Sequence, residues 1–227
     1  MRTQHFTKRD QGLTWIEVLI VVAVLAILTS IWLPRLARSK FRSSRSNCTS
    51  NVKQIGIAFR LYANDNDVEY PQSLTNLTQA WQYFQQLGNE LSSPKVLICP
   101  SDGSRPANGH YSAADFTSMS NGEPATNNFS HPIHRDGSLS YFVGLDAKET
   151  RPQMILTGDR NLTMKPLPSG NIWTLGINST VGWTEKMHDK GGNVGLADGS
   201  AEQITNRKLI EKLRNTGDTT NRIVMPQ

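Results

Sequence analysis

Two histidines and an aspartate in the stretch HPIHRDG have types and a spacing that could bind zinc. His131 and His134 lie three residues apart, and Asp136 follows them. Imidazole nitrogens and carboxylate oxygens are common zinc ligands. Two histidines three residues apart are also common in loops, so the alternative is a loop that binds no metal, and we favour that alternative.

An acidic stretch farther toward the amino end offers a second set of possible metal ligands. Asp65, Asp67 and Glu69 place carboxylates at alternating positions, and calcium prefers oxygen ligands of this kind. The stretch lacks the twelve-residue pattern of an EF-hand loop. A solvated turn is therefore the interpretation that we favour, and calcium remains a possible cofactor.

A histidine and an aspartate near the carboxyl end could act together in acid–base catalysis. In the stretch HDKGGNVGLADGS, nine residues separate His188 from Asp198. The sequence contains no serine-hydrolase elbow, CxxC pair or phosphate-binding glycine loop, so no nucleophile accompanies the pair. The glycines and the Asp198-Gly199 pair predict a loop, a short strand and a hairpin turn in which Gly199 supplies a positive φ. We therefore predict a structural role for this motif.

The elements that must position these side chains begin with an apolar run near the amino end. From Leu13 to Leu33, Glu17 is the only ionisable residue. A helix over this range would be about 31 Å long, which matches the hydrocarbon core of a bilayer. A charged group costs roughly 2.5–3.5 kcal/mol at the centre of a bilayer. We therefore expect Glu17 to have a partner, and a plain signal anchor with a stray carboxylate is the alternative.

The charge distribution argues against a nucleic-acid-binding protein and leaves the membrane orientation open. The net charge is +5, but basic residues are concentrated on both sides of the apolar run, and the chain is nearly neutral beyond residue 50. The run is too long for a secretory signal, and no small-residue cleavage site follows it. The larger basic cluster follows the run and would place the large domain in the cytoplasm. The polar, cysteine-containing composition of that domain indicates the outside.

The two cysteines, Cys48 and Cys99, both follow the apolar run. The pair fits one disulfide in an oxidising compartment better than a metal site, which would need more ligands. Two buried free thiols are the alternative.

The apolar pattern after Pro34 predicts that the helix continues into a folded domain. Val52, Ile55, Phe59 and Tyr62 follow one another at spacings of three and four. One long helix is therefore expected from about Leu13 to Ala63, with a membrane half and an amphipathic half.

The remainder of the chain predicts an α+β head in which a small antiparallel sheet packs on the amphipathic half of this helix. A long irregular insertion is expected over Asp102–Asp136, and a polar tail is expected after the last helix. The expected helices are Leu77–Gln86 and Asn206–Arg214. The expected strands are Leu139–Val143, Met154–Thr157, Asn171–Leu175 and Gly182–Lys186, followed by the Asp-Gly hairpin of Asn193–Ala197 and Ser200–Ile204.

The stretch QGLTWIE, followed by VLIVVAVLAIL, resembles the processing site of type IV pilins and type II secretion pseudopilins. The resemblance implies cleavage between Gly12 and Leu13 by a prepilin peptidase and N-methylation of Leu13. It also implies that Glu17 faces the α-amino group of a neighbouring subunit in a filament, and that Pro34 is the helix-bending proline of the family. Two residues depart from the usual pattern, because Leu13 stands where phenylalanine is common and Trp15 where leucine is common.

Two further stretches resemble large-headed pseudopilin-like proteins, which carry an N-C-x-x-N-x-K-Q-I-G pattern, a tyrosine and an acidic turn that ends in proline. The matching residues are Asn47, Cys48, Asn51, Lys53, Gln54, Ile55, Gly56, Tyr62 and Pro71. The stretch LICPSDG, which contains Cys99, matches another element of this group. The resemblance implies that Cys48 and Cys99 are bonded and that the bond ties the helix to the head.

The motif formed by His188, Asp198 and Gly199 matches the H-X9-DG element that accompanies prepilin-type amino ends. The resemblance as a whole implies a pilin-like fold in four parts. Residues 1–12 are a cleaved leader, 13–33 a transmembrane and filament-core helix, 34–63 its amphipathic continuation, and 64–227 a periplasmic globular head.

The resemblance implies a structural subunit of a type II secretion or type IV pilus-like filament, and not an enzyme. The implied partners are the prepilin peptidase, other pilins or pseudopilins, an inner-membrane assembly platform and the inner membrane. The implied location is the inner membrane, crossed once, with the amino end cytoplasmic and the head periplasmic, and a filament after assembly. A membrane-anchored periplasmic binding or hydrolytic domain is the alternative from another class.

Overall fold

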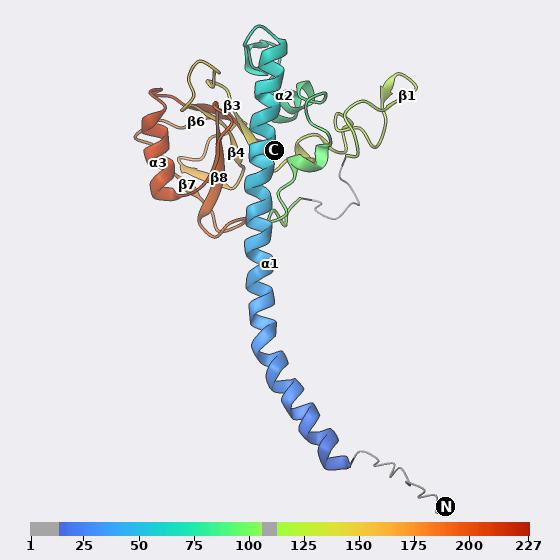
Figure 1. Ribbon diagram of the computed structural model, residues 1–227. Coiled ribbons are helices and arrows are strands. Elements are labelled where there is room, and N and C mark those ends of the chain that lie inside the picture. Colours follow the sequence, from blue (N-terminus) through green and yellow to red (C-terminus); the bar gives the residue numbers. More distant parts are fainter. Residues whose placement is uncertain (1–13, 106–112) are drawn as a thin grey trace, which may run out of the picture. The chain divides into compact units, whose positions relative to one another are not determined.

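The computed structural model describes residues 14–105 and 113–227, so the predicted cleavage site at Gly12 and Leu13 lies outside the described residues (Figure 1). The chain divides into two compact units, Met1–Arg42 and Ser43–Gln227. One helix, α1 (Trp15–Asp65), begins in the first unit and ends in the second. This confirms the predicted long helix to within two residues at each end.

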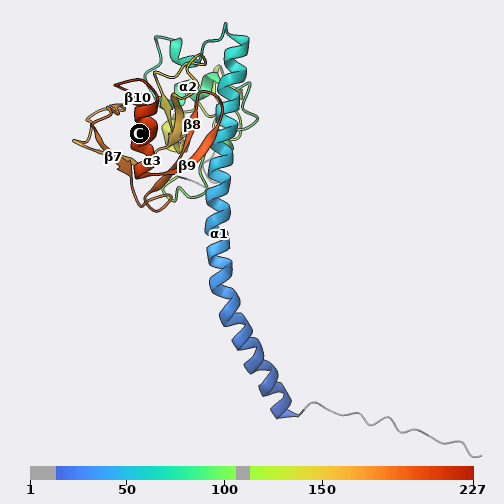
Figure 2. The ribbon, with the colours of Figure 1, turned by 60° about the vertical axis from the view of Figure 1, so that its left-hand side comes forward.

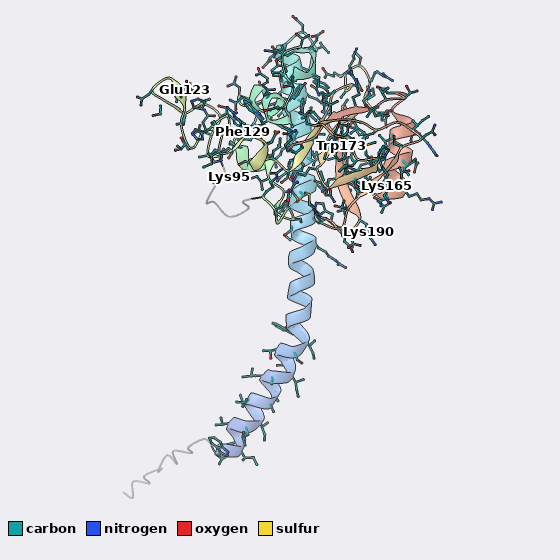
Figure 3. The ribbon with its side chains drawn as sticks, turned by 180° about the vertical axis from the view of Figure 1, so that it is seen from behind. Lys95, Glu123, Phe129, Lys165, Trp173 and Lys190 are labelled. Carbon is teal, nitrogen blue, oxygen red and sulfur yellow. A yellow bond between two sulfur atoms is a disulfide. The ribbon has the colours of Figure 1, made fainter. Side chains whose placement is uncertain are left out.

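In the first unit, the part of α1 from Trp15 to Trp32 is long and apolar enough to cross a membrane, with a mean hydropathy of 2.4. None of this stretch is buried inside the protein, and Figure 3 shows its side chains standing out from the helix. The two hydroxyl side chains donate hydrogen bonds to carbonyls of the preceding turn, Thr29 to Leu25 and Ser30 to Ile27. No described hydroxyl in the stretch therefore needs water, which suits an apolar surrounding.

In the second unit, α1 buries the predicted stripe. Val52, Ile55 and Phe59 of this stripe are fully buried, and so is Cys48 before them. Tyr62 is half-buried, and residues between them such as Lys53 are exposed. Spacings of three and four place these buried side chains on one face of the helix. That face packs on the sheet of the head, and Figure 2 shows this part of α1 running beside the strands.

The head contains a six-stranded antiparallel sheet in the order β6-β10-β3-β4-β8-β9. Its strands are β3 (Tyr141–Gly144), β4 (Ile155–Asp159), β6 (Ile172–Thr174), β8 (Gly191–Leu196), β9 (Ala201–Thr205) and β10 (Arg222–Val224). A register shift interrupts the pairing of β4 with β8 between Ile155 and Thr157. A second, two-stranded sheet pairs β5 (Leu162–Lys165) with β7 (Thr180–Trp183).

Both faces of the large sheet are covered, because side chains of successive residues point to opposite faces of a strand. Tyr141 and Val143 of β3 belong to the core beneath α1 and α2 (Ala80–Gln86), while Phe142 between them belongs to a second core. This second core includes residues of the β5–β7 sheet and of α3 (Asn206–Asn215). The expected sheet packed on a helix is therefore confirmed, and a further layer lies behind it (Figures 1 and 2).

Several boundaries differ from the expectation, and the largest difference lies after α3. The predicted polar tail contains β10, whose Ile223 and Val224 are buried and which pairs with both β3 and β6. A three-residue strand is too short to produce a periodic pattern, so burial on both faces was not visible in the sequence. The strand β5 was also missed.

The insertion expected over Asp102–Asp136 is mostly irregular where it is described. It contains the two-residue strands β1 (Met119–Ser120) and β2 (Glu123–Pro124) and the start of the 3-10 helix η3 (Arg135–Ser138). The other 3-10 helices are η1 (Pro71–Ser73) and η2 (Pro94–Leu97).

Candidate functional site

The first candidate site is the beginning of α1, where Glu17 has a local partner that the sequence analysis missed. Glu17 Oε2 accepts hydrogen bonds from the backbone N and the Oγ1 of Thr14, each at 2.7 Å. The Glu17 backbone N lies 3.4 Å from Thr14 Oγ1. A threonine followed three residues later by a glutamate is the signature of a capping box, and it was readable from the sequence.

The surface around Glu17 is apolar and exposed. Large side chains on all sides of the helix, such as Trp15, Leu25 and Trp32, are 79%, 54% and 68% exposed. An exposed apolar surface of this extent marks a membrane or protein interaction site. The first unit therefore presents a surface suited to lipid or to other helices, with one carboxylate at its end.

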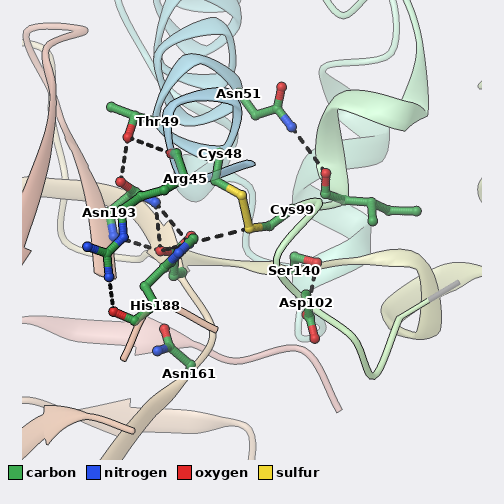
Figure 4. The surroundings of a disulfide bond; sticks show 12 residues. Arg45, Cys48, Thr49, Asn51, Cys99, Asp102, Ser140, Asn161, His188 and Asn193 are labelled. Atoms are coloured by element: carbon green, nitrogen blue, oxygen red, sulfur yellow. Dashed lines mark hydrogen bonds and ion pairs between the residues drawn. A yellow bond between two sulfur atoms is a disulfide. The ribbon is translucent and has the colours of Figure 1, made fainter. Parts of the chain in front are cut away.

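The second candidate site lies in the head, where the cysteine and histidine motifs meet. Cys48 of α1 and Cys99 form a disulfide, which confirms the predicted pairing. His188 Nε2 lies 3.4 Å from Cys99 Sγ, and both residues are fully buried (Figure 4). Beside the disulfide, Asn51 Nδ2 donates to the carbonyl of Ile98 at 3.1 Å. Segments far apart in the sequence therefore join at one place on α1.

Asp159, His188 and Asn193, here called the histidine cluster, form a hydrogen-bonded group with no exposed surface. His188 Nε2 lies 3.2 Å from Asp159 Oδ2. The same oxygen accepts hydrogen bonds from Asn193, from its backbone N at 2.7 Å and from its Nδ2 at 2.9 Å. Thr49 Oγ1 on α1 donates to Asn193 Oδ1 at 2.6 Å. The cluster thus connects β4, β8 and α1.

The electrostatics of the histidine cluster are dominated by burial. Burial raises the pKa of the Asp159 carboxyl, and the hydrogen bonds and charge from His188 and the hydrogen bonds from Asn193 only partly offset this. Asp159 Oδ1 and His188 Nδ1 have no hydrogen-bond partner among the described residues. A buried group of this kind has no access to a substrate, so the geometry disfavours hydrolytic chemistry at His188.

The partner of His188 is Asp159 of β4, and Asp198 lies at the opposite end of β8 in the hairpin turn to β9. Asp198 Oδ1 accepts a hydrogen bond from the backbone N of Ser200 at 2.8 Å, and Gly199 has φ +81°. A structural hairpin turn was predicted here, and the structure contains it. The histidine's actual partner was missed, because Asp159 lies on a separate strand and no local pattern connects the two residues.

The hairpin turn packs against α1 where the helix carries a glycine. A Cβ on Gly56 would lie 3.3 Å from the Cα of Gly199, so a side chain there would press on the turn. One turn later, Arg60 donates to the carbonyl of Asp198 at 3.1 Å. The hydroxyl of Tyr70 donates to the carbonyl of Ala197 at 2.8 Å, and burial raises the pKa of Tyr70 to about 12. Gly56 lowers the helix propensity of α1, but it allows the backbone of the hairpin turn to approach the backbone of the helix closely.

Asp102, in the LICPSDG stretch, holds a second buried polar group. Arg160 donates to both of its carboxylate oxygens, at 2.7 Å and 2.9 Å, and Ser140 donates at 2.9 Å. Burial alone would raise the pKa of Asp102, but the hydrogen bonds from Arg160, Ser104 and Ser140, with the charge of Arg160, outweigh it and lower the pKa. This ion pair ties the segment after Cys99 to the end of β4.

The two histidines considered as zinc ligands are engaged in loop contacts. His134 Nε2 donates to the carbonyl of Thr126 at 2.7 Å, and its Nδ1 lies 3.4 Å from Ser138 Oγ. The centroids of the His131 and His134 rings are 6.4 Å apart. Asp136 Oδ1 accepts a hydrogen bond from the backbone N of Trp81 at 2.9 Å. These contacts give each group a structural partner.

The two aspartates considered as calcium ligands, Asp65 and Asp67, are exposed at the end of α1. Asp67 also lines a cavity of about 420 Å³ with Tyr70, Gln72 and Glu149. Among the described residues, the group whose ligand atoms lie close enough to share a metal ion consists of Cys48, Cys99 and His188 instead. Calcium binding at the acidic stretch stays a prediction.

Comparison with known proteins gives short but significant similarities to pilins and pseudopilins. The chain is 34% identical over 67 residues to the type IV major pilin protein PilA of Myxococcus xanthus, which is 30% of each chain. It is 29% identical over 65 residues to the type II secretion system core protein G of Pectobacterium carotovorum, and 27% identical over 77 residues to that of Escherichia coli. No protein-family model and no solved structure matches the chain significantly.

The chain is thus similar to type IV pilins and to type II secretion pseudopilins, as the amino-terminal residues predicted. The matched stretches cover 29–33% of this chain, 41% of the Pectobacterium protein and 52% of the Escherichia coli protein. The α+β fold with one apolar amino-terminal helix and an antiparallel sheet is consistent with the pilin fold. The helix and the relatives together fit a protein anchored in the inner membrane.

Proposed function

We propose that this protein is a structural subunit, a pilin or pseudopilin, of a type II secretion or type IV pilus-like filament. The observation that carries the proposal is the stretch Trp15–Trp32, an apolar helix with no part buried inside the protein. A surface of this kind is stable in a membrane before assembly and against other copies of the same helix after assembly. The similarity to PilA and to core protein G supports the same function.

The proposal gives Glu17 two successive partners. In the single chain its carboxylate accepts two hydrogen bonds from Thr14. After cleavage between Gly12 and Leu13, the new α-amino group of a neighbouring subunit would offer a cation to the same carboxylate. A buried carboxylate is tolerated where a cation lies within hydrogen-bond distance, and loss of either partner leaves the other unpaired. The pair would therefore fix the register of neighbouring helices.

The proposed orientation places the amino end in the cytoplasm and the head in the periplasm. The Cys48–Cys99 disulfide supports this orientation, because disulfides persist in oxidising compartments. The proposed partners are a prepilin peptidase that cuts after Gly12, the inner-membrane platform that assembles the filament, and other pilins or pseudopilins. Pro34, inside α1, would permit the helix to bend in the packed filament.

The test is the mass of the mature amino terminus in cells with and without the prepilin peptidase. A chain that begins at N-methylated Leu13 only when the peptidase is present is the expected result. A chain that begins at Met1 in both strains, or that is cut beyond Leu33, would contradict the proposal. Glu17→Ala should then reduce filament assembly while processing continues. Thr14→Ala removes the side-chain hydrogen bond to Glu17, keeps the one from the backbone N, and should leave assembly intact.

A membrane-anchored binding or hydrolytic domain is the second candidate function. The cavity lined by Asp67, Tyr70 and Glu149 is the feature that favours it. The full burial of His188 and Asp159 argues against hydrolysis at the best-formed histidine site. No resident cofactor is required by the filament function. Calcium at Asp65 and Asp67 is a separate proposal, which calorimetric titration of the full chain with and without Asp67→Asn would test.

A further inference from the structure

The disulfide and His188 bring three potential metal ligands to one buried place, and Asp159 lies beside the histidine. The two sulfur atoms and a ring nitrogen of His188 lie within 4.8 Å of one another. Asp159 Oδ2 lies 3.2 Å from the same nitrogen. All four residues are fully buried. Two sulfurs, one imidazole and one carboxylate form a donor set that suits zinc.

Two distances in this group are close to those between the ligands of a tetrahedral zinc ion. Bonds of about 2.3 Å to sulfur and about 2.1 Å to nitrogen and oxygen separate sulfur from nitrogen by about 3.6 Å, and nitrogen from oxygen by about 3.4 Å. The corresponding distances here are 3.4 Å from Cys99 Sγ to His188 Nε2 and 3.2 Å from His188 Nε2 to Asp159 Oδ2. The two bonded sulfur atoms must separate to about 3.8 Å, and Asn193 Nδ2, which lies 3.2 Å from His188 Nε2, must move away from this nitrogen.

The surroundings already hold two of these ligands in place. Asn193 donates two hydrogen bonds to Asp159 Oδ2, and such contacts orient the ligands of metal sites. The other oxygen, Asp159 Oδ1, has no partner among the described residues. Arg45 donates a hydrogen bond to the backbone carbonyl of His188. A disulfide alone does not require a buried carboxylate and imidazole beside it.

We propose that the reduced form of this protein binds one zinc ion through Cys48, Cys99, His188 and Asp159. A thiol reductant is oxidised to its own disulfide while the Cys48–Cys99 bond takes up two electrons and two protons and becomes two thiols. Zinc then displaces two protons from these thiols and forms two zinc–sulfur bonds. The disulfide and the zinc ion are alternative links between α1 and the loop that carries Cys99. The zinc ion would also bind the segment before β8 through His188 and β4 through Asp159.

The test uses the full chain in detergent, in oxidised and reduced pools, with Co²⁺ as a spectroscopic probe. The reduced pool should bind one Co²⁺ with the absorption of a tetrahedral thiolate site, and one equivalent of Zn²⁺ should remove that absorption. The oxidised pool should show neither change. Reduced wild type without thiolate absorption would overturn the proposal.

Two matched variants separate this site from unspecific binding by thiols. His188→Gln should weaken Co²⁺ binding by about tenfold or more. His131→Gln, the same change in a loop outside the cluster, should leave binding unchanged. Equal affinity in wild type and His188→Gln would overturn the assignment of His188 as a ligand.

A second measurement keeps the proposal testable if reduction loosens the head. Zinc at one hundred times its dissociation constant should raise the melting temperature of the reduced chain by about 5–10 °C. The oxidised chain and the Cys48→Ser/Cys99→Ser variant should not respond. A reduced chain whose melting temperature zinc leaves unchanged would also overturn the proposal.

Discussion

Two parts of the same helix differ in how they meet their surroundings. From Trp15 to Trp32 no side chain of α1 is buried in the protein, while Val52, Ile55 and Phe59 are fully buried against the head. The first part exposes apolar side chains on all sides, and the second exposes one side only, which carries mostly polar side chains together with Ile57 and Leu61. A helix can therefore be complete in its hydrogen bonds and still lack its packing partners. Packing within this chain therefore stabilises only the second part, and the first part needs lipid or other helices to cover its apolar side chains.

The largest expected effect comes from making the same truncation in both parts. Phe59→Ala should destabilise the head by about 3–5 kcal/mol, because it leaves a cavity beside Tyr70 and Phe84. Leu25→Ala should leave the free energy of unfolding of the head unchanged, since Leu25 is 54% exposed. Urea denaturation of the full chain in detergent measures both. An equal loss in the two variants would contradict the comparison.

The disulfide should contribute the next largest effect. Cys48→Ser/Cys99→Ser should lower the free energy of unfolding of the oxidised protein by about 2–4 kcal/mol, because the bond closes a long loop in the unfolded chain. The variant should still insert into membranes, since the apolar part of α1 contains neither cysteine. Urea denaturation without reductant measures the first quantity, and membrane fractionation measures the second.

The buried ion pair of Asp102 should make the stability of the head depend on acid. The folded state lowers the pKa of Asp102 below its ordinary value of about 3.9, so this group stabilises the fold above that pH and the contribution is lost as the pH falls through the folded-state pKa. Asp102→Asn should lower the free energy of unfolding by about 1.5–3 kcal/mol at neutral pH. It should also make the free energy of unfolding less dependent on pH in the acid range.

The test is to measure the free energy of unfolding of wild type and Asp102→Asn between about pH 2 and pH 7 and to compare how it changes with pH. Asp67→Asn is the matched control, because Asp67 is exposed in the turn after α1. Parallel curves for wild type and Asp102→Asn would show that Arg160 does not hold a charged carboxylate in the fold.

The smallest expected effect concerns the contact between Tyr70 and the hairpin turn. Tyr70→Phe removes the hydrogen bond to the carbonyl of Ala197 and should cost about 1 kcal/mol. Tyr62→Phe, on a half-buried tyrosine of α1, is the control and should cost less. Thermal unfolding resolves the difference, and an effect at Tyr62 equal to that at Tyr70 would remove the special role of this contact.

Local patterns in the sequence predicted the parts of the fold that extend over many residues. The helix from Trp15 to Asp65 has a long apolar run and then a regular stripe, and both signals come from neighbours along the chain. The strand β10 carries only Ile223 and Val224 as buried residues, and its partners β3 and β6 lie far away in sequence. Its burial comes from tertiary packing, which a single sequence does not display.

The same distinction applies to the sites. The resemblance of the cysteine stretches predicted the Cys48–Cys99 bond, and the glycine after Asp198 predicted the turn. The contact between His188 and Asp159 joins the segment before β8 to the end of β4, and no local sequence pattern connects the two residues. The capping box of Thr14 and Glu17 was not predicted, although the spacing of a threonine and a glutamate three residues apart is visible in the sequence.

The position of β10 also determines the order in which the head can be completed during synthesis. β6 joins the large sheet only through β10, and β10 leaves the ribosome after every other strand of that sheet. Until β10 arrives, the edges of β3 and β6 have no partner in the sheet. A nascent chain therefore exposes the unpaired edges of β3 and β6 until β10 is synthesised, and unpaired strand edges can bind other chains. A factor that shields nascent strands, or rapid release of the finished chain, would matter more here than for a sheet closed by its earliest strands.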